Sequence, residues 1–309
     1  MFLSMLQMVL PVVVTFLLGA FCRTKKLFGE DALQGMKSLV SRVLLPVTLF
    51  NAFFTANYTG GILVIGAVVT VSFALSLLLG FACRRFVQPY GKYLPFLLSN
   101  FEGGMLGYAL FVLLYPGQSS VFAMIDIGQT VFGWTVYVTL LQATAGEKQS
   151  LGQVVRGMAT NPCLIAVFSG ILLGATGIGA WVLQSAAAGV VTSLIGFLTA
   201  PISLLILVIV GYEMSFRSDL IAPVLKTVGL RLAIMGVLAA AVSGVIFSIL
   251  PFDKPLLTAI LLAYSLPAPF IVPLYVKEKE QLSFLSTALS MQTVTALVLF
   301  AAIAAYSVL

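Results

Sequence analysis

Two acidic residues stand inside long apolar stretches of the chain, where a charge is costly, and they are the first candidates for chemistry. Glu102 lies in the segment Asn100-Phe-Glu-Gly-Gly-Met-Leu-Gly107, and Asp126 lies in Asp126-Ile-Gly-Gln129. A carboxyl group in such a place can carry a proton, bind a cation or accept hydrogen bonds from helix backbone. These three alternatives stay open for Glu102. For Asp126, a role with a bound ion competes with capping a helix or bonding two helices together.

The absence of histidine and the spacing of the cysteines exclude several other kinds of site. It contains no histidine, and its three cysteines, Cys22, Cys83 and Cys163, are far apart and lack the spacing of metal ligands. His-based metal sites and catalytic triads are therefore excluded. We predict no metal site, and we expect free thiols packed among apolar side chains. A membrane-embedded enzyme would need more polar catalytic groups than one Glu and one Asp, so we expect no enzymatic activity.

The composition indicates a membrane protein. Of the 309 residues, 61% are hydrophobic and 8% are charged, whereas a soluble globular protein carries about 25% charged residues. So few charges cannot cover the surface of a soluble protein of this length. A soluble enzyme, a nucleic-acid-binding protein and a disordered chain are therefore excluded, and the expected surroundings are a lipid bilayer.

Ten apolar segments are long enough to cross a bilayer, which takes about 20 residues each. Turn residues such as Pro116-Gly117 and the stretch 57–61 separate them. The predicted spans are 1–22, 34–56, 62–83, 92–115, 119–144, 160–177, 183–212, 227–250, 255–276 and 281–307.

The basic residues predict the orientation of these spans. If alternate connections face one side, that side holds 15 of the 16 basic residues, and Lys254 alone faces the other. Short loops rich in Lys and Arg stay cytoplasmic, so both termini are predicted outside the cytoplasmic (inner) membrane. The net charge of +6 then reports orientation and not an anionic partner. The residues counted on the cytoplasmic side are Arg23, Lys25, Lys26, Lys37, Arg42, Arg84, Arg85, Lys92, Lys148, Arg156, Arg217, Lys226, Arg231, Lys277 and Lys279.

The spans divide into two similar halves. Residues 1–144 and 160–309 each hold five spans, and a cytoplasmic connection over 145–159 joins the two halves. Because each half has an odd number of spans, the second half must enter the membrane in the inverted orientation. The triplet Gln-Thr-Val occurs at Gln129 and again at Gln292. Pro46 and Pro201 lie at similar depths, as hinges or as ordinary kinks. Inverted repeats with interrupted helices are typical of secondary transporters.

Two interruptions are predicted near the middle of the bilayer. At 1.5 Å per residue, Glu102 lies about 15 Å from one face and Pro267 about 18 Å from the other, in a core about 30 Å thick. Ordinary kinks are the alternative. Two broken helices would present opposed N-termini that attract an anion, held by backbone N–H groups because no Lys or Arg is expected at that depth. The expected lining is Asn51, Asn100, Glu102, Gly103, Gly104, Gly107, Gln129, Ser265, Pro267, Ala268, Pro269 and Gln292.

These motifs resemble the auxin efflux carrier family, which includes plant auxin exporters and bacterial malate or malonate permease-like proteins. The resemblance spans the chain but departs from the family pattern at Glu102, where the pattern has Asn. It implies ten helices in inverted five-helix repeats, with the broken helices 92–115 and 255–276 crossing, as in bile-acid symporters and the antiporter NhaA. The matching segments are 102–109, Asp126–Gln129, Asn161-Pro162, 266–269, 277–278 and 286–290.

The sequence therefore predicts an all-α secondary transporter for a small organic anion, such as malate, malonate or an auxin-like acid. Transport would proceed by alternating access and be coupled to a proton through Glu102. A sodium-coupled symporter of the bile-acid type and a non-transporting membrane sensor are the alternatives. We expect no cofactor other than a coupling H⁺ or Na⁺ and no nucleic-acid partner. A homodimer, the direction of transport and the substrate are left open.

Overall fold

The computed structural model describes residues 2–56, 60–146 and 151–308, and over these residues it contains helices and no strands. Eight helices are long and apolar enough to cross a membrane, and a ninth is counted if the pair Pro162–Ala175 and Ile178–Gln184, bent by 75°, is one span. The chain is thus a helical protein built to span a bilayer. The eight are Met5–Thr24, Glu30–Phe54, Gly61–Val87, Leu94–Leu114, Ser119–Thr144, Ala188–Glu213, Ser218–Ile249 and Lys279–Ser307.

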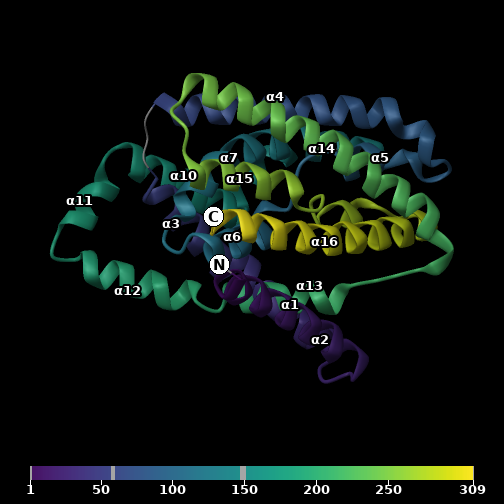
Figure 1. Ribbon diagram of the computed structural model, residues 1–309, viewed down its shortest axis with the longest axis horizontal. Coiled ribbons are helices and arrows are strands. Elements are labelled where there is room, and N and C mark those ends of the chain that lie inside the picture. The colour runs from purple at the N-terminus through teal and green to yellow at the C-terminus, as the bar shows by residue number, and fades with distance from the viewer. Residues whose placement is uncertain (1, 57–59, 147–150, 309) are drawn as a thin grey trace.

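The helices are labelled in chain order, and Figure 1 shows these labels for most of the α-helices. The first half holds α1 (Phe2–Thr24), α2 (Glu30–Leu39), η1 (Val40–Leu44), α3 (Leu45–Phe54), α4 (Gly60–Cys83), α5 (Leu94–Leu98), η4 (Gly103–Gly107), α6 (Tyr108–Leu114), α7 (Ser119–Phe132), η5 (Gly133–Tyr137) and α8 (Val138–Thr144). The second half holds α9 (Leu151–Thr160), α10 (Pro162–Ala175), α11 (Ile178–Gln184), α12 (Ala188–Thr199), α13 (Ile202–Glu213), α14 (Ile221–Ile249), α15 (Lys254–Ser265), η7 (Val272–Tyr275) and α16 (Lys279–Ser307).

The predicted span 255–276 is interrupted, as the prolines near its middle predict. Its first part, α15, has 12 residues. The chain then runs without helix through Leu266 and forms only the four-residue 3₁₀ turn η7. Pro267, Pro269 and Pro273 explain this, because each lacks the N–H that a helix needs. The ten-span inverted repeat therefore stays a prediction.

Other boundaries also differ from the predicted ones. The connection 145–159 includes most of α9, and the turn expected after Ala175 is followed by the additional helix α11. Gly177 allows that bend, because its φ of +81° is in the left-handed region that favours glycine. Residues 57–59 of the predicted turn and residues 147–150 of the predicted connection 145–159 lie outside the described residues.

Both candidate hinge prolines lie where a helix is irregular. Pro46 follows the π-helical turn η1, and Pro201 lies in the turn that separates α12 from α13. A proline removes one backbone hydrogen bond and crowds the preceding turn, so the helix changes its geometry there. Whether these two positions move as hinges remains a prediction.

The helices pack in two groups. In one group α1 packs along α13 and α3 packs along α10; in the other, α4 packs along α5, α7 and α14, and α14 packs along α15 and α16. Figure 1 shows α4, α14 and α16 along the long axis, with α11 and α12 at one end. The two ends of the chain are close, because Ser307 of α16 contacts Met8 of α1 at 3.9 Å.

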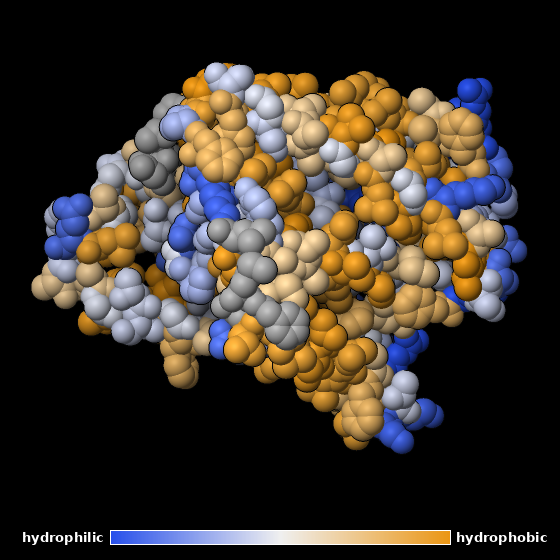
Figure 2. Space-filling model, viewed as in Figure 1, coloured by the Kyte–Doolittle hydropathy of each residue, from blue (hydrophilic) through white to orange (hydrophobic). Residues whose placement is uncertain are grey.

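The outer surface is apolar over much of its area. Phe197, Leu63 and Trp181 are 81%, 75% and 71% exposed. Figure 2 shows hydrophobic atoms across the middle of the visible face and hydrophilic atoms gathered at the right edge. Apolar exposure on this scale suits contact with lipid tails and does not suit contact with water. The orientation of the termini remains a prediction.

A partly exposed ion pair links the start of the first broken span to the residues that follow the second. The Lys92 ammonium donates a hydrogen bond to the Glu278 carboxylate at 2.6 Å, joining the residues before α5 to the start of α16. This hydrogen bond lowers the pKa of the Glu278 carboxyl below its usual value. Because both side chains are nearly half exposed, the pair contributes little to stability.

Close packing of α1 on α13 provides a test of the fold. A Cβ atom on Gly211 would lie 2.0 Å from the carbonyl oxygen of Phe16, whereas a Cβ on Gly236 of α14 would meet nothing within 4 Å. We expect Gly211→Ala to lower the melting temperature in detergent clearly. The control Gly236→Ala should leave it unchanged or raise it, because alanine is favoured over glycine in a helix by about 0.5–1 kcal/mol. Equal melting temperatures for the two variants would contradict the packing.

Candidate functional site

The two broken spans meet at their irregular segments, 99–102 and 266–271, and bond to each other there through their backbones; we call this junction the crossing. The first span is helical over α5, becomes irregular from Ser99 to Glu102, and is helical again from η4 into α6. The N–H group of Glu102 donates a hydrogen bond to the carbonyl oxygen of Pro267 in the second span at 2.9 Å. Asn100 makes the sharp turn with a φ of +58°, a conformation that asparagine tolerates better than most residues. The break predicted near Glu102 is therefore present.

A buried arginine bonds the carbonyl groups where the first parts of both spans end. The Arg231 guanidinium, on α14, donates to Leu97 O at 2.8 Å, to Asn100 O at 2.7 Å and twice to Leu266 O at 2.8 and 3.2 Å. Its side chain is 4% exposed. A cation placed against helix C-terminal carbonyls is electrostatically favourable. Arg231 thus holds α5, α15 and α14 together.

This arginine corrects two predictions. Arg231 was counted among the residues that mark the cytoplasmic side, and no Lys or Arg was expected at the depth of the breaks. It is instead buried beside them. The arginine side chain is long and its guanidinium carries five donors, so it reaches inward from its helix to carbonyls at the breaks in both spans.

Glu102 bonds the N–H groups on the opposite side of the crossing. One carboxylate oxygen accepts from Met105 N at 3.1 Å, in the first turn of η4, and the other accepts from Phe270 N at 2.8 Å, ahead of η7. The alternative of an acid bonded to helix backbone is therefore the observed geometry. Of the two opposed helix N-termini that the sequence predicts, the structure has one. η4 together with α6 forms a helix of several turns, whereas η7 has only four residues.

The two glutamines of the Gln-Thr-Val triplets bond the same irregular backbone. Gln129, on α7, donates to Phe101 O at 3.1 Å. Gln292, on α16, accepts from Ala268 N at 2.9 Å and donates to Leu97 O at 3.1 Å. Each amide thus satisfies main-chain groups that the breaks release from helical hydrogen bonding. The hydrogen bond of Gln129 joins two residues of the first half of the chain. Gln292 lies in the second half and bonds one residue of each half.

Asp126 bonds two helices of the first half. Its carboxylate accepts a hydrogen bond from the Tyr108 hydroxyl at 3.1 Å, and its side chain is 3% exposed. Gly103 makes this position possible, because a Cβ there would lie 2.7 Å from one Asp126 oxygen. The geometry is that of helix–helix bonding between α7 and α6, one of the two alternatives for this residue.

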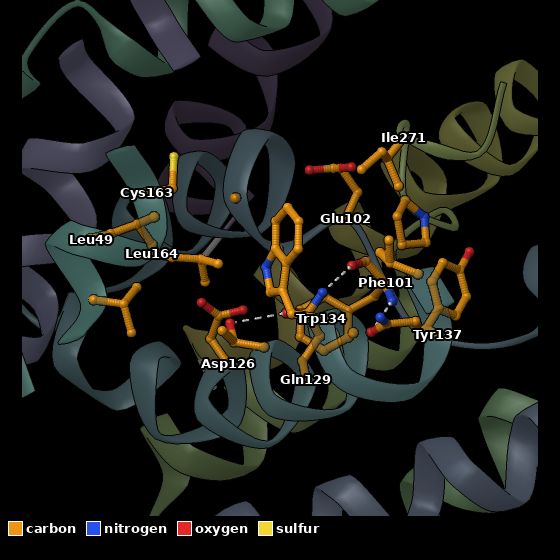
Figure 3. A pocket seen from close by; sticks show the side chains of 18 of the residues that line it. Leu49, Phe101, Glu102, Asp126, Gln129, Trp134, Tyr137, Cys163, Leu164 and Ile271 are labelled. Atoms are coloured by element: carbon orange, nitrogen blue, oxygen red, sulfur yellow. Dashed lines mark hydrogen bonds between the residues drawn. The ribbon is translucent and has the colours of Figure 1, made fainter. Parts of the chain in front are cut away.

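Both acids line one cavity of about 200 Å³, which we call the acidic cavity. Figure 3 shows Glu102 and Asp126 on its wall, with the indole of Trp134 lying between them in this view. Asn100, Gln129, Asn161 and Tyr137 also line it, and the Tyr137 hydroxyl donates to Phe96 O at 2.7 Å. Its lining contains acids, amides and aromatic rings, but no Lys or Arg among the described residues.

A second cavity of about 450 Å³ lies against the same glutamate, and we call it the hydroxyl cavity. Its α16 wall carries Ser286, Ser290 and Thr293 at helical spacing, and much of the remaining wall is apolar. Lys37 of α2 and Glu213 of α13 form an ion pair on its lining. Glu102, Leu45 and Ile271 line both cavities, so they form the partition between the two.

The predicted site residues are only partly brought together. Ser265 and Gln292 line a third cavity of about 10 Å³ with Arg231. Gly107 packs against Phe122, and Pro267 and Ala268 take part through their backbones. Asn51 lies on α3, where its carbonyl accepts a hydrogen bond from Thr55. The predicted residues on the lining of the acidic cavity are Asn100, Glu102, Gly103, Gly104, Gln129 and Pro269.

Sequence reasoning missed Arg231, Trp134, Tyr137 and Asn161 as residues near the site. The sequence did mark Arg231 as unusual, since it is the one basic residue inside the apolar run 227–250. The two aromatic residues stand one to two turns beyond Gln129, but aromatic residues are common in membrane helices. Among the described residues no group of three or more His, Cys, Asp or Glu could hold a metal ion.

Comparison with known proteins finds similarity to a protein that is named as a transporter. No protein-family model matches the chain. Over 307 residues it is 24% identical to a protein of Methanothermobacter thermautotrophicus described as an uncharacterized transporter, and the match covers 96% of each chain.

The role of Arg231 in the crossing can be tested by substitution. We expect Arg231→Met to destabilise the protein by roughly 3 kcal/mol or more, because it leaves buried carbonyls without donors. Arg231→Lys should recover part of the loss, since lysine keeps the charge but not the planar fork of donors. The readout is thermal unfolding in detergent.

A matched control comes from an exposed arginine. Arg217 pairs with Asp219 on the surface at 2.7 Å, and both side chains are more than half exposed. Arg217→Met should therefore change the melting temperature little. If Arg231→Met has the same melting temperature as the wild type, Arg231 does not hold the crossing together.

Proposed function

We propose that this protein is a membrane transporter that carries a small organic anion through the crossing of its two broken spans. One observation supports this above the others: main-chain N–H groups from both spans, those of Met105 and Phe270, converge on a single carboxylate. In the structure that carboxylate belongs to Glu102. Irregular backbone inside a bilayer is tolerated where it is buried in protein or lines a cavity, and discontinuous helices at that depth are where transporters bind substrate.

The size of the acidic cavity favours a small substrate. Its volume of about 200 Å³ is below the roughly 300–1,000 Å³ of pockets for drug-sized ligands. A short-chain acid such as malate or malonate is of suitable size, and the adjoining hydroxyl cavity provides room for a larger body such as that of an auxin-like acid. The resemblance to auxin efflux carriers and the transporter relative support the same class of function.

The packing of the helices supports alternating access. The acidic cavity lies between the breaks on one side and α3 and α10 on the other, since Leu45, Leu49 and Leu164 line it. α3 and α10 pack on each other, and α1 packs on α13. We infer that these helices form a panel that moves against the crossing, with Pro46 and Pro201 at its irregular points. A cytoplasmic membrane location and outward termini remain part of this proposal.

The acidic groups around the cavity are the argument for coupling transport to a proton on Glu102. A substrate carboxylate in the acidic cavity would lie near two carboxyl groups, those of Glu102 and Asp126. Like charges at short range in a poorly solvated site repel strongly. Uptake of a proton by Glu102 removes one of them, so proton and anion would bind together.

A second candidate, sodium-coupled transport as in bile-acid symporters, is favoured by the same lining. Two acids with amide and hydroxyl oxygens, and no Lys or Arg within the described lining, suit a monovalent cation. The cation would then neutralise the acids in place of a proton.

Transport by purified protein in liposomes tests these alternatives. We expect counterflow of at least one labelled carboxylate from a panel of mono- and dicarboxylates. Uptake should be stimulated by an inwardly directed proton gradient and be indifferent to sodium. Stimulation by sodium alone would favour the symporter, and no exchange of any anion by folded protein would contradict the proposed function.

A further inference from the structure

We propose that the Glu102 side chain is a tethered occupant of the anion site, so that a substrate carboxylate binds only after the Glu102 carboxylate has left it. This inference rests on the proposed function and adds to it a competition between the chain's own carboxylate and the substrate. Because both are carboxylates, both are recognised by the same two N–H groups.

The hydrogen bonds identify which atoms form the anion site. The Glu102 oxygens accept from Met105 N at 3.1 Å and Phe270 N at 2.8 Å, so each oxygen has its own donor and the donors come from different spans. Two donors arranged in this way suit any carboxylate of the same geometry. A substrate carboxylate could therefore take the place of Glu102 with both hydrogen bonds preserved.

The position of Glu102 gives the displaced side chain somewhere to go. It lies on the partition between the acidic cavity and the hydroxyl cavity and lines both. A Cβ on the neighbouring Gly104 would lie 3.9 Å from a Glu102 oxygen and 3.2 Å from Leu45, so the absence of a side chain there keeps space beside the carboxylate. Rotation of Glu102 away from the N–H groups would open them to a ligand in either cavity.

Glu102 is held in a way that permits release. The ion pairs within the described part of the chain are Lys37–Glu213, Lys92–Glu278 and Arg217–Asp219, and Glu102 belongs to none of them. Its partners are neutral N–H groups. Arg231, in contrast, holds the other side of the crossing with four hydrogen bonds. The crossing thus has a fixed side at Arg231 and an exchangeable side at Glu102.

Protonation provides the release. Hydrogen bonds to a charged carboxylate are about twice as strong as those to a neutral group. A proton on Glu102 therefore weakens its hold on both N–H groups and leaves an incoming anion as the stronger acceptor. The titratable and charged groups that surround Glu102 are Asp126, Tyr137 and Cys163 at the acidic cavity, Lys37 and Glu213 at the hydroxyl cavity, and Arg231 behind the break.

Binding of acetate to purified protein tests the proposal, with its neutral analogue acetamide as the ligand control. In Glu102→Ala the two N–H groups lose their occupant, so we expect acetate to bind on the order of tenfold more tightly than to the wild type at neutral pH. Glu102→Gln should gain less, because its amide oxygen still accepts one of the hydrogen bonds. The readout is the shift in melting temperature as a function of acetate concentration.

Asp126→Ala is the matched control, since it removes a negative charge from the same cavity without freeing the N–H groups. If it gains as much affinity for acetate as Glu102→Ala, the effect is general charge removal and the proposal is overturned. A gain for acetamide equal to that for acetate would also overturn it, because a freed cavity, not a freed anion site, would then explain the binding.

A measurement on the wild type covers the case in which Glu102→Ala does not fold. Methanesulfonate stays ionised across the working pH range, and its binding to the wild type should strengthen as the pH falls and Glu102 is released. Binding that is independent of pH would contradict the proposal. Transport of carboxylates with such pH-independent binding would leave the proposed function standing and reject the tethered occupant alone. Tight acetate binding by Glu102→Ala without any transport by the wild type would leave the tethered occupant standing and reject the proposed function.

Discussion

The need to satisfy backbone polar groups at the crossing of two interrupted helices governs the centre of this protein. In a bilayer no water pairs with carbonyl and N–H groups that leave a helix, and each unpaired group costs several kcal/mol. The carbonyls at the ends of α5 and α15 are bonded by Arg231, and the N–H groups beyond the break are bonded by Glu102. Gln129 and Gln292 bond further groups of the same segments.

Opposite charges placed in this way follow the polarity of the backbone. Carbonyl ends of helices carry partial negative charge and N–H ends carry partial positive charge, so a guanidinium suits the former and a carboxylate the latter. Burying either charge is costly, and buried ionic groups are weak evidence for stability in themselves. Their presence here is better explained by the irregular backbone they permit, because that backbone creates the two cavities that meet at Glu102.

The two charged residues differ in how firmly they hold the crossing, and this difference connects structure to transport. Arg231 is bonded to three carbonyls from both broken spans and is buried away from the two large cavities. Glu102 is bonded to two N–H groups and is open to both cavities. In the proposed mechanism, the rigid side keeps the spans in register while the other side exchanges its ligand. A binding site for a transported molecule needs both properties, since it must hold its shape and yet release what it binds.

Sequence alone was sufficient to predict the class of the protein, most of its spans, the break near Glu102 and the two acids within the spans. These properties are local: hydropathy, proline and glycine act over a few residues, and a carboxyl group inside an apolar run is visible without a structure. The prolines after Ser265 also signalled a break, but they did not reveal that only a 3₁₀ turn follows.

The side chains that complete the crossing are visible in the folded structure and not in the sequence. Arg231 lies 131 residues from Asn100, and Phe270 lies 168 residues from Glu102, yet each pair is hydrogen-bonded. The sequence pattern of Arg231 is the same for a residue at a membrane face and for one that reaches inward, because spacing does not determine side-chain direction. The same holds for Glu102: the sequence predicted an acid beside two broken helices, and the packing of the second broken span brought the Phe270 N–H group to its carboxylate.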